Sequence, residues 1–203
     1  QSPFKIARKI ATGDVVGEYI TIIEGWTIED IASYLEEKEI SQREEVLAYA
    51  DFEGYLFPET YRTTKDMDIK ELITLMLKTF DEKISLQWRE EIERQGKTLP
   101  EIIVMASILE KELQTLEDKK IATNVLQKRL DIGMALQVDA APITYERKGL
   151  PESPIANPGL ASIEAAIYPT KNPYWYYLST KEGETIFSKT LDEHNIAKAR
   201  YLR

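Results

Sequence analysis

The segment Thr98-Leu-Pro-Glu-Ile-Ile-Val-Met-Ala-Ser-Ile-Leu-Glu-Lys-Glu112 lies near the middle of the chain and decides its fold. Thr98 and Glu101 have the spacing of a capping box, and Pro100 suits the first turn of a helix. The apolar residues that follow recur at helical spacing, so we expect a helix with one side in the core. The core-facing residues would be Ile102, Met105, Ala106, Leu109 and Leu113.

Glu110 is the candidate acid of this helix. At about 100° per residue, it shares a narrow sector with Ile103, Ala106 and Ser107, beside the main apolar stripe. Burial among small and apolar side chains disfavours a charged carboxylate, so Glu110 could stay protonated near neutral pH and act as a general acid. The alternative is a boundary glutamate that pairs with a lysine. Helix geometry by itself favours that alternative, because perturbed carboxylates are a minority.

Helical periodicity, capping signals and β-branched runs predict the elements on both sides of this helix. We expect helices over residues 3–11, 68–96, 116–130 and 163–167, the last with Ser162 as its cap. Three more helices are marked by their first residues: Thr27 as a cap with Asp30 three residues on, a capping box at Ser41 and Glu44, and a capping box at Thr190 and Glu193. We expect strands over residues 19–23 and 135–139, and a hairpin of 174–178 with 184–187. The predicted fold class is α+β, helix-rich with a small sheet.

Composition excludes several classes of function. The 203 residues are 43% hydrophobic, enough for one core or for a main core with a small satellite. The 26 Lys and Arg residues against 35 Asp and Glu residues give a net charge of -9, which disfavours nucleic acid. The absence of cysteine and the presence of one histidine, His194, argue against thiol catalysis, a Ser-His-Asp triad and a metal site, so we expect no metal and no cofactor. Chemistry would depend on carboxylates.

No apolar run approaches the ~20 residues that span a bilayer. The longest run covers residues 102–106. We therefore expect a soluble protein, or a soluble fragment of an anchored one.

Six segments carry a resemblance to a known family. In chain order they are Glu53-Gly-Tyr-Leu-Phe-Pro-Glu-Thr-Tyr61, Ala106-Ser-Ile-Leu-Glu-Lys-Glu112, Leu136-Gln-Val-Asp139, Pro154-Ile-Ala-Asn-Pro-Gly159, Ala165-Ala-Ile-Tyr-Pro169 and residues 187–195. Together they closely resemble the bacterial endolytic murein transglycosylases, the YceG-like or MltG proteins. The resemblance covers the chain from about Gly17 to its C-terminus.

The resemblance implies an enzyme held in the bacterial cell membrane by a single N-terminal helix that this chain lacks. Its catalytic domain would lie on the periplasmic, or extracytoplasmic, side. Residues 1–45 would be the remnant of a LysM-like subdomain, and residues 46–203 the catalytic domain. The implied partners are the glycan strands of peptidoglycan and, beyond them, cell-wall synthases.

The resemblance also implies that Glu110, the first glutamate of the Glu-Lys-Glu motif, is catalytic. Helix geometry selects the same residue. The implied reaction is non-hydrolytic cleavage of the β-1,4 bond between N-acetylmuramic acid and N-acetylglucosamine, which gives 1,6-anhydro ends. The candidate substrate contacts are Glu53, Tyr55, Tyr61, Ser107, Gln137, Asp139 and Asn157. For each of them a role in the core or in a loop is the alternative.

Two departures weaken the assignment of contacts around Asp139. The family usually has Asp-Pro-Thr where this chain has Asp139-Ala-Ala-Pro142. The family also has a longer loop where this chain has only Glu146-Arg-Lys-Gly149, between Tyr145 and Leu150.

Two other functions stay open. A glycan-binding scaffold of the cell-wall synthesis machinery would use the aromatic residues without cleaving, but it would have no need of Glu110. A hydrolytic muramidase would need a second carboxylate to activate water, for which Glu53 and Asp139 are the candidates.

Overall fold

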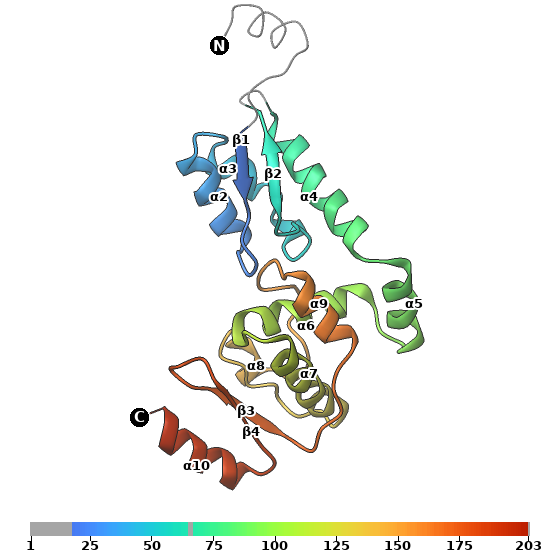
Figure 1. The fold of residues 1–203 in the computed structure, drawn as a ribbon, viewed down its shortest axis with the longest axis vertical. Helices are drawn as coiled ribbons and strands as arrows, with labels where there is room; N and C mark the ends of the chain where they lie inside the picture. The colour runs from blue at the N-terminus through green and yellow to red at the C-terminus, as the bar shows by residue number, and fades with distance from the viewer. Residues whose placement is uncertain (1–17, 65–66, 203) are drawn as a thin grey trace, which may run out of the picture.

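The computed structural model describes residues 18–64 and 67–202 as a helix-rich α+β fold with two small antiparallel sheets, which confirms the predicted class (Figure 1). The helices are α2 (Ile28–Glu37), α3 (Arg43–Leu47), η1 (Ala50–Phe52), α4 (Ile69–Lys83), α5 (Leu86–Arg94), α6 (Leu99–Glu112), α7 (Leu116–Asp131), α8 (Ile143–Glu146), α9 (Leu160–Ile167) and α10 (Leu191–Tyr201). The strands are β1 (Glu18–Thr21), β2 (Thr60–Thr63), β3 (Tyr176–Ser179) and β4 (Thr185–Ser188). The helix predicted over residues 3–11 lies outside the described residues.

The chain forms two hydrophobic cores. The first joins the β1–β2 sheet to α2, α3 and the beginning of α4, where Met76 is fully buried. In this sheet Ile20 pairs with Tyr61 and Thr21 with Thr60. The first core therefore extends well beyond residue 45, where we expected a domain to end. The LysM-like character of residues 1–45 stays a prediction.

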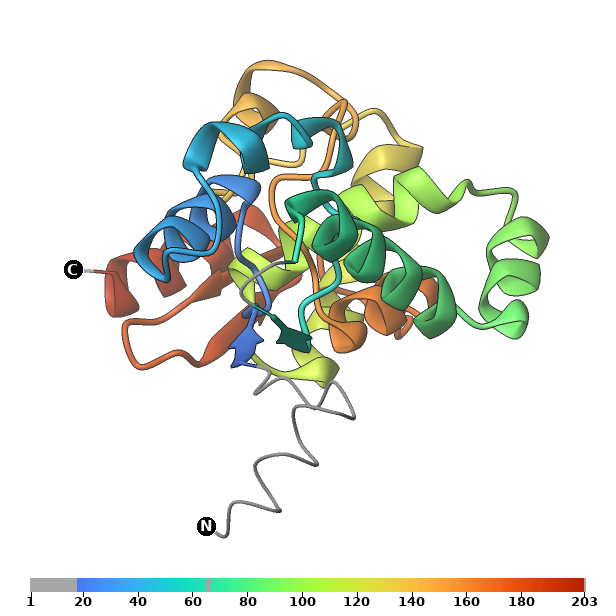
Figure 2. The ribbon, with the colours of Figure 1, turned by 90° about the horizontal axis from the view of Figure 1, so that it is seen from above.

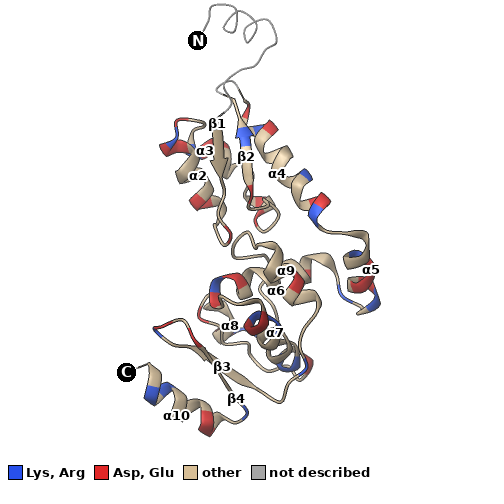
Figure 3. Ribbon diagram, viewed as in Figure 1, with Lys and Arg blue, Asp and Glu red and all other residues tan. Residues whose placement is uncertain are grey.

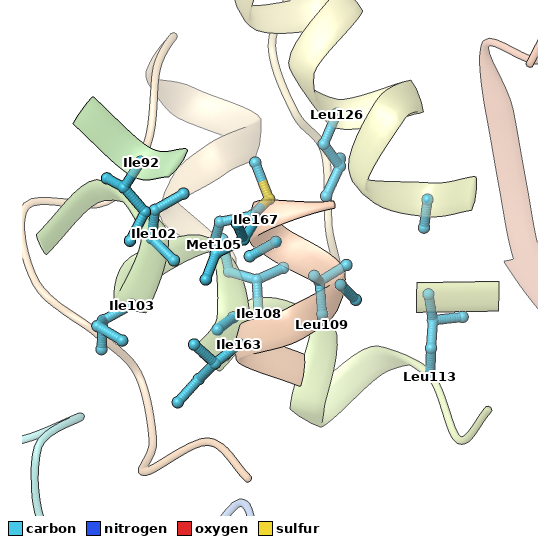
Figure 4. Close-up of a cluster of buried hydrophobic side chains, with 14 of the residues drawn as sticks. Ile92, Ile102, Ile103, Met105, Ile108, Leu109, Leu113, Leu126, Ile163 and Ile167 are labelled. Carbon is cyan, nitrogen blue, oxygen red and sulfur yellow. The ribbon is translucent and has the colours of Figure 1, made fainter. Parts of the chain in front are cut away.

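Helix α6 is the axis of the second core. Every residue from Ile102 to Leu109 is buried, so the helix is enclosed on all sides and not only along the predicted stripe. It packs against α9, α7 and α5. Figure 4 shows side chains of these four helices converging on one cluster, among them Ile92, Met105, Ile108, Leu126, Ile163 and Ile167. A helix that is hydrophobic all round has to be a central one.

Several predicted boundaries are confirmed by their caps. Thr27, Thr98 and Thr190 each accept a hydrogen bond from the backbone of the residue three positions on, whose side chain accepts one in return. The predicted hairpin is present as β3 and β4, with Tyr177 opposite Phe187. These features depend on residues close together in sequence.

Two predictions in the first half of the chain are wrong in detail. The single helix expected over residues 68–96 is divided into α4 and α5, because the Ser85 hydroxyl accepts a hydrogen bond from the Trp88 amide and starts a new helix. Helix α3 is capped by Gln42 and Glu45, one residue later than the predicted pair.

Two predictions in the second half are also wrong. Residues 135–139 form no strand: Gln137 has a left-handed φ of 52°, and the amides of Gln137 and Val138 donate to Thr144 instead of to a neighbouring strand. Helix α9 begins at Leu160 with Gly159 as its cap, so Ser162 lies inside the helix and its hydroxyl is directed elsewhere.

Seen from above, α4 and α5 extend to one side, and the hairpin and α10 lie on the other (Figure 2). Acidic and basic residues are interspersed along the described helices and do not form one basic face (Figure 3). Among the described helices, none combines the length and apolar composition needed to cross a membrane.

A glycine marks the junction between the two cores. Gly54 has a φ of +88°, and a Cβ atom there would lie 2.5 Å from Pro154 Cβ and 2.9 Å from Ile103 Cγ2. Gly96 has a similar φ of +69°, but open space surrounds the position of its Cβ.

We expect Gly54→Ala to lower the free energy of unfolding by about 2–5 kcal/mol, the sum of left-handed strain and overpacking. Gly96→Ala is the control. It should lower the free energy of unfolding only by the cost of left-handed strain, about 1–2 kcal/mol. Urea unfolding of both variants measures the difference. Equal losses would show that residue 54 is not tightly packed.

Candidate functional site

Glu110 lies in the last turn of α6 and is held by three hydrogen-bond donors. Its Oε1 accepts from Lys119 Nζ at 3.0 Å. Its Oε2 accepts from the Gly159 amide at 2.9 Å and from the Ser162 hydroxyl at 2.7 Å. The Glu110 side chain is only 9% exposed and that of Lys119 only 5%.

This environment differs from the prediction. We expected apolar and small neighbours that would favour a neutral acid, but all three neighbouring groups donate to the side chain, as to an ionised carboxylate. Ser107, which was expected one turn away in the same sector, bonds the Val104 carbonyl and the Ile155 amide instead. Glu110 is therefore a buried carboxylate in a polar setting.

Helix α9 supplies two of these donors because its first turn points at Glu110. The N-terminal end of a helix carries partial positive charge and free amides, which suit a carboxylate. Gly159, the cap, lies against the side chain of Glu24: a Cβ on Gly159 would be only 1.9 Å from Glu24 Oε1. A side chain at residue 159 would therefore displace the carboxyl group of Glu24 from its present position.

The loop after β1 covers Glu110. Gly25 has a φ of +80°, and its Cβ would lie 3.4 Å from Glu110 Cγ. Its amide donates to the Asn157 carbonyl at 2.8 Å, and its carbonyl accepts from Lys111 Nζ at 3.2 Å. Hydrogen bonds thus join the loop both to α6 and to the segment before α9.

Glu24 and Lys119 are site residues that sequence reasoning missed. Partial burial raises the pKa of Glu24, the negative charge of Glu110 raises it further, and Lys119 lowers it. The carboxyl groups of Glu24 and Glu110 therefore repel each other, and both are attracted to Lys119. Gly25 after a predicted strand signalled a turn at Glu24, but nothing in the local sequence marked Lys119.

Asn157 connects loops through its buried side chain. It is completely buried, and its Oδ1 accepts from the amides of Gly54 and Leu56, both at 2.9 Å. Its Nδ2 donates to the Trp26 carbonyl at 3.0 Å and to Glu53 Oε1 at 2.7 Å. An asparagine side chain has no further capacity for hydrogen bonds. In this structure Asn157 therefore has no polar side-chain atom left for the predicted contact with substrate.

Glu53 belongs to the same network. Its Oε2 accepts from the Ile28 amide at 2.9 Å, which anchors the start of α2, while Oε1 accepts from Asn157. Burial is the main cause that raises the pKa of Glu53. Because each of its oxygens accepts a hydrogen bond from another segment, Glu53 holds the loops together.

Tyr61 and Ser107 are core residues. Tyr61 is 3% exposed, and its hydroxyl donates to the Phe57 carbonyl at 2.6 Å, while Ser107 is fully buried. Neither side chain is accessible to a sugar ring in this structure, so the predicted contacts of Tyr61 and Ser107 find no support here. Tyr55 is half-buried and packs edge-on against Phe80, with ring centroids 5.1 Å apart.

Gln137 and Asp139 are exposed and line a separate cavity of about 520 Å³ beside Glu112. Asp139 Oδ1 accepts from the Tyr145 hydroxyl at 2.6 Å, and Glu112 Oε1 accepts from the Ala140 amide at 2.6 Å. Burial raises the pKa of Glu112 and the charge of Asp139 adds to it. Glu112 thus lines this cavity, and Glu110 does not.

The chain is similar to known proteins along most of its length. The model of the YceG-like family matches residues 1–143 and 143–200. The two matches meet next to residues 145–150, where the resemblance predicted a shorter loop than the family has.

Two curated relatives are named endolytic murein transglycosylase. The one from Bacillus subtilis (strain 168) is 32% identical over 173 residues, covering 74% of this chain and 48% of the relative. The one from Streptococcus pneumoniae (strain R6) is 26% identical over 219 residues, covering 94% of this chain and 37% of the relative. The chain therefore spans about half the length, or less, of these relatives.

A solved structure is similar along almost the whole chain. The crystal structure of a YceG-like protein from Listeria monocytogenes has a TM-score of 0.78 and 31% identity, covering 96% of this chain and 81% of the other. With a family model that matches nearly every residue and a solved member that shares the fold, the chain belongs to the YceG-like family.

Proposed function

We propose that this chain is the catalytic portion of an endolytic lytic transglycosylase of peptidoglycan. It cleaves the β-1,4 bond between N-acetylmuramic acid and N-acetylglucosamine and thereby terminates or trims glycan strands. Family membership and the names of the relatives support the proposal. The observation that carries it is the position of Glu110, on which two of the six family-like segments converge through the bond from Gly159.

The proposed reaction needs one carboxyl group for two proton transfers. Glu110 first donates its proton to the bridging oxygen as the bond from that oxygen to C1 of the muramic residue breaks. The resulting carboxylate then accepts the proton of the muramic C6 hydroxyl, whose oxygen bonds to C1. No water is consumed, because the nucleophile belongs to the sugar.

The three donors suit the carboxylate that exists between these two steps. Lys119, Ser162 and the Gly159 amide hold its orientation and stabilise its charge in a site with little water. Ser162 can also turn its hydroxyl and accept a hydrogen bond, so it can adapt to a protonated Glu110. Gly25 leaves no side chain over Glu110.

We further propose the cellular setting that the resemblance implies. The chain would lie on the extracytoplasmic side of a bacterial membrane, tethered by an N-terminal helix of the longer protein. Residues 1–45 would be the LysM-like remnant and residues 46–203 the catalytic domain. Glycan strands would be the substrate and cell-wall synthases the partners.

One observation favours a hydrolytic muramidase as the second candidate. The carboxyl group that interacts with Glu110 is that of Glu24, and not Glu53 or Asp139 as predicted. A second carboxylate could activate water and give reducing ends. The products of the reaction separate the two chemistries.

We expect Glu110→Gln to lower cleavage of purified glycan strands by at least about 100-fold, because an amide cannot transfer the proton. Mass spectrometry of the products measures both rate and chemistry: anhydro ends support the transglycosylase, and reducing ends the muramidase. Glu164→Gln is the matched control, since Glu164 pairs with Lys120 on the outside of the same helix bundle. Full activity of Glu110→Gln would remove the proposed mechanism. A wild-type chain that binds strands without cutting them would favour the scaffold.

We expect Lys119→Met to lower the free energy of unfolding by about 3–5 kcal/mol, because it leaves a buried carboxylate without its cation. Lys120→Met removes the partner of Glu164, whose side chain is 36% exposed, and should lose no more than about 1 kcal/mol. Thermal or urea unfolding tests both. Losses of equal size would show that the Glu110–Lys119 pair is not effectively buried.

A further inference from the structure

A second site lies at the C-terminal end of α6. The cavity of about 520 Å³ is enclosed by the end of α6, residues 137–145, β3 and α10, elements that lie together in the lower part of Figure 1. Its volume is within the range of small-ligand sites. The catalytic proposal for Glu110 makes no use of it.

Two buried polar atoms in the wall of this cavity have no hydrogen-bond partner among the described residues. They are the Tyr177 hydroxyl and His194 Nδ1. An unpaired buried polar group costs about 1–3 kcal/mol, and phenylalanine would fill the place of Tyr177 without that cost. Unpaired groups of this kind at the edge of a cavity suggest a ligand that supplies the missing bonds.

The charged groups of the lining favour an uncharged ligand. Two carboxylates, Glu112 and Asp139, oppose three cations, Lys111, Arg129 and Lys198, so the net charge of the lining is small. The Lys111 ammonium group already donates to the Gly25 carbonyl. Arg129 directs three of its five N–H groups to the carbonyls of Leu136 and Trp175, so most of its hydrogen-bonding capacity is used within the wall. Burial, with the charges of Lys198 and Arg129, lowers the pKa of His194, which keeps the ring neutral at pH 7.

The remaining groups suit a sugar ring. Tyr176 stacks on His194 with ring centroids 5.3 Å apart, and the Arg129 guanidinium lies 5.1 Å from the centroid of the Tyr176 ring. Both rings line the cavity, where they can pack against the C–H groups of a pyranose. Asp139 uses one oxygen for Tyr145 and has no hydrogen bond on the other within the described residues. Hydroxyl groups of a sugar both donate and accept, so they can pair with Asp139 and with Tyr177.

We infer that this cavity binds an uncharged sugar ring of a glycan strand, with Tyr177, Asp139 and the Tyr176–His194 stack as its contacts. The inference rests on the proposed function, because it places the ring on the same strand that Glu110 would cleave. Lys111 links the two places: it lines the cavity, and it holds the Gly25 carbonyl above Glu110. A strand bound in the cavity would continue towards the cleavage centre.

The test is a calorimetric titration of the whole chain with chitotetraose, a neutral β-1,4 oligomer of N-acetylglucosamine. Tyr177→Phe should weaken binding at least about tenfold, a loss of about 1.4 kcal/mol, while the stability of the protein stays equal or rises because an unpaired hydroxyl is gone. Asp139→Ala, a change at an exposed residue, should weaken binding as well. Tyr19→Phe and Asp51→Ala, both exposed and outside the cavity, are the matched controls and should bind like the wild type.

The outcomes separate this inference from the proposed function. Glu110→Gln should bind chitotetraose like the wild type while it loses cleavage. Undiminished binding by Tyr177→Phe and Asp139→Ala, or no binding by the wild type, would overturn the inference and leave the role of Glu110 intact. Cleavage by Glu110→Gln would overturn the proposed function and leave the cavity measurement valid.

Discussion

The buried side chain of Asn157 is the interaction on which the arrangement of this protein depends. It accepts from two amides of the segment after η1 and donates to Trp26 and Glu53, so four hydrogen bonds join the first core to the second. The Asn157 backbone adds two more bonds, to Gly25 and Trp26. Because a buried amide cannot leave these groups unpaired without a penalty, the loop after β1 is fixed over α6.

That fixed loop gives Glu110 its surroundings. A carboxylate and an ammonium group have to lose their water to reach a place that is less than a tenth exposed, and the attraction between them only partly offsets this. Two well-packed hydrophobic side chains in place of Glu110 and Lys119 would stabilise the core at least as well. The charged pair at the meeting point of α6, α7 and α9 is therefore not explained by stability, and the role proposed for Glu110 is consistent with its presence there.

The match to the family model divides beside two cavities of the second core. The family match divides at residue 143, and residues 143–155 line a second hollow of about 410 Å³. The resemblance predicted a longer loop in this region. Thr144 lines this hollow and the neighbouring Tyr145 lines the Glu112 cavity, so the two cavities adjoin at this connection.

Local sequence was sufficient for much of the fold. The capping boxes at Thr27, Thr98 and Thr190 and the hairpin were predictable, because each depends on residues a few positions apart. Glu110 could be selected from helix geometry and from the family motif. Its partners could not: Glu24, Lys119 and Ser162 reach it from three other segments.

The tertiary structure also decided which predicted contacts are available. Tyr61, Ser107 and Asn157 have side chains that suit a sugar, but each is buried with its polar atoms paired inside the protein. Residues 135–139 have the composition of a strand, yet Thr144 takes their amides and no neighbouring strand is present within the described residues. A sequence specifies which groups can form hydrogen bonds, whereas the fold decides which of those groups are already paired and which remain for a ligand.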